Sequence, residues 1–126
     1  MSDLPPFELG YPRTELRRQL VDAVLRGEKT ATAGLLSDYE AEDERPDKAG
    51  DRCALLGFDD EPVAVIEVTE SRVVPAAEID AEFARDEGEG YDTVEEWLVA
   101  HERFFERQIE PETQIVAVRF CVVERL

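Results

Sequence analysis

The stretch Gly27-Glu28-Lys29-Thr30-Ala31-Thr32 marks a change of structure along the chain. The apolar residues before it recur at the spacing of one helix face: Leu16, Leu20, Val24 and Leu25. Thr14 is placed to cap this helix and Gly27 to end it. After Gly27 the residues become short and compatible with a β-strand. The sequence therefore predicts a helix over residues 14–26, followed directly by a group of polar side chains.

The remainder of the chain alternates between strand and helix patterns. Residues 52–58 and 63–69 are β-rich runs joined by a short turn, which predicts an antiparallel hairpin whose second strand continues toward Val74. Pro75 fits the first turn of a short helix with Ala76, Ile79 and Phe83 on its inner face. Residues 115–123 are β-branched enough for a central strand.

Two further segments complete the predicted architecture. Thr93 and Glu96 have capping-box spacing, and an apolar stripe then predicts a helix to about Ile109: Val94, Trp97, Leu98, His101 and Phe105. The acidic residues 37–47 predict a surface loop of a length that often accompanies a lid. Strands separated by helices, with a hairpin, predict an α+β mixed sheet or small barrel in one domain over residues 1–126.

Composition limits the partners of the protein. Its 126 residues carry 31 acidic and 14 basic side chains, a net charge of −17, which disfavours duplex DNA because duplex affinity depends on neutralised phosphates. No stretch approaches the roughly 18 apolar residues of a membrane span, and the first residues lack a signal-peptide pattern. We therefore expect no membrane partner and a cytoplasmic location.

The cysteines and the histidine indicate neither a metal site nor a cofactor. Cys53 and Cys121 lie in apolar runs and are predicted to be buried and reduced. No Cys/His spacing suggests a metal, and His101 is the only histidine. On an apolar stripe, a lone histidine is more often a hydrogen-bonded core residue than a catalyst.

The polar residues after Gly27 are the first candidate site. Lys29, Thr30 and Thr32 bring an amine and two hydroxyls to one turn, which suits a clamp on a phosphate or carbonyl, or an activated nucleophile. A surface turn with a solvated lysine explains the same spacing equally well. A phosphate-binding P-loop is excluded because here the helix comes first. In a regular strand Lys29 and Thr32 would face opposite sides, so the backbone must turn or bulge for them to meet.

A second candidate is Glu87-Gly88-Glu89-Gly90, where two glycines permit conformations that aim a carboxylate into a cleft. An acidic, solvated loop is the simpler interpretation of this segment taken alone. Tyr39 and Tyr91 border the two candidate segments and are candidates for lining a pocket. Trp97 and Phe104 suit core packing first and stacking on a ligand second.

Taken together, these segments resemble the ASCH domain family, which has the PUA-like fold. The resemblance rests on the order of Gly27-x-Lys29-Thr30-Ala31-Thr32, residues 46–51, residues 65–69, residues 87–90 and the aromatic positions from Trp97 to Phe105. It implies a small mixed β-barrel with flanking helices, a cleft beside it, and a role linked to RNA or nucleotides. Many members carry an arginine where this chain has Gly34.

One branch of the family hydrolyses the acetyl amide of N4-acetylcytidine with a lysine, a threonine three residues later and a distant glutamate. By this resemblance Lys29, Thr32 and Glu87 are candidate catalytic residues, with Glu89 as the alternative carboxylate. Candidate ligand contacts are Thr30, Tyr39, Glu89, Tyr91 and Trp97. The branch is shorter and lacks the Trp97/His101/Phe105 pattern.

Two hypotheses follow from this resemblance. In the first, Thr32 attacks the acetyl carbonyl, Lys29 takes its proton, and Glu87 orients or protonates the nitrogen. That role requires a neutral lysine, whereas nearby negative charge favours the ammonium. In the second, the cleft binds a nucleoside or short single-stranded RNA without cleaving it. The sequence leaves both open and does not indicate the oligomeric state.

Overall fold

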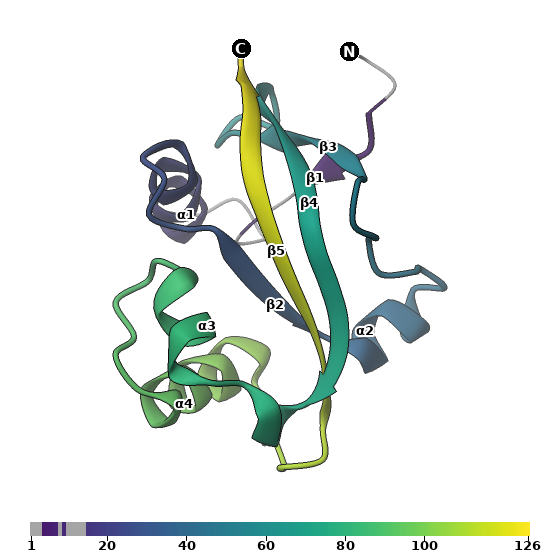
Figure 1. The fold of residues 1–126 in the computed structure, drawn as a ribbon, viewed down its shortest axis with the longest axis vertical. Helices are drawn as coiled ribbons and strands as arrows, with labels where there is room; N and C mark the ends of the chain where they lie inside the picture. Colours follow the sequence, from purple (N-terminus) through teal and green to yellow (C-terminus); the bar gives the residue numbers. More distant parts are fainter. Residues whose placement is uncertain (1–3, 8, 10–14) are drawn as a thin grey trace.

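The structure is a computed structural model that describes residues 4–7, 9 and 15–126. Among these residues five strands form one mixed sheet in the order β1-β3-β4-β5-β2 (Figure 1). The strands are β1 (Pro6–Phe7), β2 (Ala31–Leu35), β3 (Arg52–Leu56), β4 (Pro62–Pro75) and β5 (Gln114–Arg125). All neighbours pair antiparallel except β1 and β3.

The α+β class is confirmed, but the predicted closure into a barrel is wrong for the described residues. The edge strands β1 and β2 do not pair with each other, so the sheet stays open. The long strands β4 and β5 dominate it, and their register shifts after Val65 and after Val68. Such shifts bend and twist a strand pair, so the two long strands are bent within the open sheet.

In the described part of the chain, four α-helices lie around the sheet: α1 (Glu15–Leu25), α2 (Leu36–Ala41), α3 (Ala81–Asp86) and α4 (Val94–Phe105). The predicted short helix after Pro75 divides into a 3-10 turn (Ala76–Glu78) and α3, and Asp80 caps α3 by accepting a hydrogen bond from the backbone of Phe83. The capping box of Thr93 and Glu96 is confirmed at the start of α4. That helix ends at Phe105, earlier than predicted, because Glu106 adopts a left-handed conformation.

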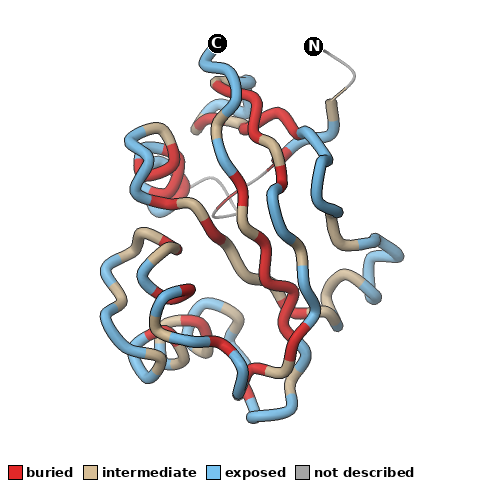
Figure 2. Tube along the Cα trace, in the orientation of Figure 1, coloured by how far each residue is buried: buried red, intermediate tan, exposed pale blue. Residues whose placement is uncertain are grey.

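The two faces of the sheet carry two apolar cores. Val116, Val118 and Phe120 point toward α1, whereas Ile115 and Ala117 point toward α3 and α4. This alternation follows from the two-residue period of a strand, and Figure 2 shows the resulting buried stretch along β5. Each core thus positions a different group of helices against the same strand.

Several local predictions require correction. The segment 37–47 is not all loop, since α2 occupies its first part. Leu16 is 37% exposed and therefore lies at the margin of the predicted inner stripe. Cys53 is buried as predicted, but Cys121 is exposed, because it lies on the face of β5 opposite to Phe120 and Val122, which pack in the core with α1. The predicted cap Thr14 lies outside the described residues.

Candidate functional site

Lys29 lies where the chain leaves α1 and enters β2. Gly27 takes a positive φ of 81° and ends the helix, as a glycine after a helix commonly does. The backbone N–H groups of Glu28 and Lys29 both bond to the carbonyl of Ala23. The bend that must separate Lys29 from Thr32 therefore comes before the strand, which starts at Ala31.

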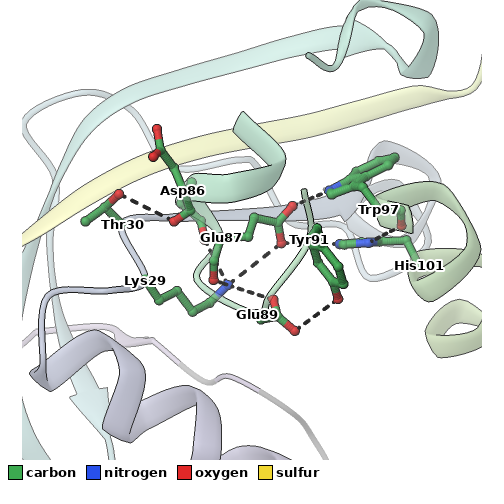
Figure 3. A network of polar contacts seen from close by, with 9 residues as sticks. Lys29, Thr30, Asp86, Glu87, Glu89, Tyr91, Trp97 and His101 are labelled. Carbon is green, nitrogen blue, oxygen red and sulfur yellow. Dashed lines mark hydrogen bonds and ion pairs between the residues drawn. The ribbon is translucent and has the colours of Figure 1, made fainter. Parts of the chain in front are cut away.

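The ammonium group of Lys29 is buried and fully hydrogen-bonded (Figure 3). The residue is 2% exposed. Its Nζ donates to the carbonyl oxygens of Ala31 at 2.8 Å and Glu87 at 3.1 Å, and to Glu89 Oε2 at 3.1 Å. An ammonium has three N–H donors, and these three acceptors use all of them. The arrangement fits a charged lysine.

Glu87 is the hub of the buried polar network. It is 1% exposed, and its Oε2 accepts a hydrogen bond from the indole Nε1 of Trp97. Its Oε1 lies 3.8 Å from Lys29 Nζ and 3.3 Å from His101 Nε2. The carboxylate is thus held from three sides, so it has little freedom to move toward a ligand.

His101 completes this network from α4. Its Nδ1 lies 2.8 Å from the carbonyl of Trp97, and the two rings stack with centroids 4.2 Å apart. Carbonyl and carboxylate oxygens only accept, so both ring nitrogens are placed to donate, as in an imidazolium. Burial lowers the pKa of His101, but the hydrogen bond and the charge of Glu87 outweigh it and leave that pKa above its ordinary value.

Glu89 is the more accessible carboxylate. Gly88 separates it from Glu87 and takes a φ of 69°, which turns the two carboxylates to different sides of Lys29. The Glu89 side chain is 22% exposed and accepts a hydrogen bond from the Tyr91 hydroxyl at 3.3 Å. Burial, together with the charges of Glu89 and Glu87, raises the pKa of Tyr91.

These residues form one wall of a cleft of about 600 Å³, a volume typical of small-molecule sites. The polar wall contains Lys29, Thr32, Glu87, Glu89, Tyr91 and His101. The other lining residues are largely apolar and include Leu20, Phe104 and Phe105. Phe104 is 50% exposed, so its ring is available to a ligand entering the cleft.

The predicted site residues do not all reach this cleft. Lys29, Thr32, Glu87, Glu89 and Tyr91 line it together, and no hydrogen bond joins the described side chains of Lys29 and Thr32. The other three predicted contacts lie elsewhere. Tyr39 lines an adjacent cavity, Thr30 directs its hydroxyl to the carbonyl of Asp86, and Trp97 is buried behind Glu87.

Sequence reasoning missed part of the lining. Asp38 and Arg103 border the cleft without having been singled out for it. Phe104, which the sequence offered together with Trp97 as a ring that could stack on a ligand, does line the cleft. Within residues 4–7, 9 and 15–126, no group of three metal-ligating side chains occurs, and no helix has the length and apolarity of a membrane span.

Fold and cleft together define an α+β protein of PUA-like architecture with a buried lysine–carboxylate site. The ASCH domain model matches residues 9–124, and the chain belongs to the ASCH domain family. Members of this family resemble RNA-binding domains. No match was found among curated proteins.

Solved structures support the same assignment. The chain is similar to protein EF3133 from Enterococcus faecalis V583, with 30% identity, a TM-score of 0.84, and coverage of 96% of this chain and 77% of that one. An ASCH domain from Lactobacillus crispatus JV V101 has 24% identity and a TM-score of 0.82, covering 96% and 80%. The hypothetical protein PH0355 shares the fold at 18% identity and a TM-score of 0.60, covering 86% and 94%.

Proposed function

We propose that the Lys29 cleft binds a small planar ligand of the nucleoside type. The carrying observation is that Lys29 and Glu87 are almost completely buried in the wall of a cleft large enough for such a ligand. Burying an ion costs several kcal/mol even when the ion is paired. Stability alone is a weak reason to keep such a cluster, whereas a few polar groups that converge on a cleft are typical of binding sites.

The chemistry of the cleft suits a nucleobase that presents neighbouring donor and acceptor groups. Glu89 is partly exposed and accepts hydrogen bonds, so it would receive an amino or amide N–H. Lys29 would donate to a ligand carbonyl by exchanging one of its present acceptors. The exposed ring of Phe104 would stack on the base, an interaction worth about 1–3 kcal/mol per base.

In this proposal the two carboxylates, Glu87 and Glu89, have different roles. Glu87 is locked by Trp97 and His101 and positions the lysine, while Glu89 contacts the ligand. The family resemblance placed the site carboxylate at Glu87 first. The greater exposure of the Glu89 side chain, 22% against 1%, favours Glu89 as the ligand contact.

Calorimetric titration with N4-acetylcytidine tests the proposal. We expect saturable binding to the wild-type protein and a loss of about tenfold in Glu89→Gln, because one charged hydrogen-bond acceptor is removed. Glu95→Gln is the matched control, since Glu95 is exposed and does not line the cleft. If the wild-type protein gave no heat of binding, this function would be refuted. Equal losses of affinity in Glu89→Gln and Glu95→Gln would also refute it.

Amide hydrolysis is the second candidate, supported by Thr32 lining the same cleft as Lys29 and Glu89. The Thr32 oxygen would attack the acetyl carbonyl and take the acetyl group as an ester. Cytidine would leave once its N4 nitrogen is protonated. Water would then cleave the threonine ester to acetate. Lys29 must lose a proton to act as the base, so its hydrogen bonds to three acceptors must rearrange.

Product analysis separates hydrolysis from binding. We expect a hydrolase to form cytidine and acetate from N4-acetylcytidine in equal amounts, and Thr32→Val to abolish this turnover while keeping the shape of the side chain. Unchanged N4-acetylcytidine after prolonged incubation with the wild-type protein would leave binding as the function.

A further inference from the structure

A second cavity of about 740 Å³ continues from the Lys29 cleft. Four residues border both spaces: Leu9, Thr32, Ala33 and Asp38. We propose that the ligand extends past Thr32 into this second cavity, and that the cavity selects an unphosphorylated nucleoside over the corresponding nucleotide. This inference rests on the proposed nucleoside function and adds the substrate class.

Gly34 of β2 and Tyr39 both line the second cavity. A Cβ built on Gly34 would lie 3.1 Å from Cε1 of Tyr39, so the tyrosine ring lies close above the bare strand. Val116 and Val118 also line the cavity. Together these residues form an apolar surface and an aromatic ring, which suit the carbon face of a sugar.

The rim of the second cavity is strongly acidic. Glu42, Glu44 and Asp47 line it, and no ion pair reaches these three carboxylates from the described part of the chain. Asp38 also lines it but pairs with Arg107 at 2.9 Å. Arg45 is the one basic residue among the described lining residues.

This charge balance opposes a phosphate group. Three unpaired carboxylates against one arginine leave an excess of negative charge, and a phosphate dianion entering the cavity would be repelled at short range. Glu42 and Glu44 are exposed and Asp47 is half-buried, so salt weakens the repulsion from Asp47 least. The same repulsion opposes an RNA strand, which would carry a phosphate on each nucleotide. The cavity therefore favours a free nucleoside.

The test compares N4-acetylcytidine with its 5′-monophosphate by calorimetry at roughly physiological salt. For the wild-type protein we expect the monophosphate to bind at least about tenfold more weakly. The variant E42Q/E44Q/D47N should reduce this ratio to less than about threefold, because the repelling charges are gone. The control E95Q/E110Q/E112Q removes the same charge at exposed positions outside the cavity and should keep the wild-type ratio.

The possible outcomes distinguish a failure of the proposed selectivity from a failure of the proposed nucleoside function. Equal affinity for nucleoside and monophosphate, or a preference for the monophosphate, would overturn the selectivity while leaving the nucleoside function intact. Discrimination that persists in E42Q/E44Q/D47N would also overturn it. If the wild-type protein binds neither compound, the proposed function fails and the selectivity fails with it.

A larger side chain at position 34 tests whether the ligand extends into the second cavity. Gly34→Leu should crowd the Tyr39 ring and obstruct the second cavity, so its affinity for N4-acetylcytidine should fall to that of the free base N4-acetylcytosine, which occupies only the Lys29 cleft. In the wild-type protein the nucleoside should bind more tightly than the base. Equal affinities for base and nucleoside in the wild type would show that nothing of the ligand enters the second cavity.

Discussion

Replacing Gly88 by alanine should damage both the stability of the protein and the Lys29 cleft. Gly88 takes a φ of 69°, a conformation that costs a residue with a Cβ about 1–2 kcal/mol. A Cβ at this position would lie 2.7 Å from the Cα of Lys29 and closer still to the carbonyl oxygen of Glu28. Those atoms belong to the backbone, so relief requires the two segments to move apart.

The left-handed conformation and the close contacts of the added Cβ both contribute to the free-energy cost of Gly88→Ala. Overpacking that forces backbone shifts costs about 1–3 kcal/mol, which together with the conformational cost gives about 2–5 kcal/mol for Gly88→Ala. Against a typical free energy of unfolding of about 5–15 kcal/mol, this is a large fraction. The displacement also separates Lys29 from Glu87 and Glu89, so binding of N4-acetylcytidine should be lost.

Gly90→Ala is the matched control for this experiment. Gly90 lies in the same segment at a φ of 91°, but among the described residues, apart from its two chain neighbours, nothing lies within 4 Å of a Cβ built there. It should therefore lose only the conformational contribution, about 1–2 kcal/mol. Urea unfolding followed by the fluorescence of the single tryptophan measures both variants. Equal destabilisation of the two variants would refute the close approach of residue 88 to Lys29.

Two further predictions concern titratable groups. His101 is the only histidine, so its NMR titration is unambiguous and should give a pKa above the ordinary value of about 6.5; a lower value would contradict the pairing with Glu87. Because the folded pKa is raised, the stability that His101 contributes should be fully present below about pH 6.5 and be lost as the pH rises through the folded pKa, a dependence absent from His101→Gln. Burial, with Asp47 and Asp51, raises the pKa of Cys53 to about 11, whereas Cys121 is exposed. Only the Cys121 thiol should therefore react quickly with a disulfide reagent at pH 8, and Cys121→Ser should abolish that fast phase.

The helices and strands with strong local patterns were predictable from the sequence. The capping box at Thr93 and the glycine stop at Gly27 act within a few residues, so the local sequence contains the whole signal. Closure of the sheet was not predictable in this way. It depends on whether β1 and β2 meet, and these strands contact β3 and β5 instead.

The candidate site was partly predictable for the same reason. Lys29 and the Glu87–Glu89 segment stand out because glycines free the backbone beside them, but 58 positions separate Lys29 from Glu87. Their contact depends on the packing of α3 against the start of β2, where Thr30 bonds to Asp86. The role of Trp97 as a hydrogen-bond donor to Glu87 has no local signal, because an indole on an apolar stripe packs in the core whether or not its N–H has a partner.

Exchange of Lys29 tests the proposed binding site most directly, and the chain supplies its own control because Lys29 and Lys48 are its only lysines. Lys29 is 2% exposed in the cleft wall, whereas Lys48 is exposed and outside it. The measurement is calorimetric titration of N4-acetylcytidine into Lys29→Met and Lys48→Met, each shown to be folded by its single indole NMR signal. The account predicts that Lys29→Met loses binding while Lys48→Met keeps the wild-type affinity. Wild-type affinity in a folded Lys29→Met variant would contradict it.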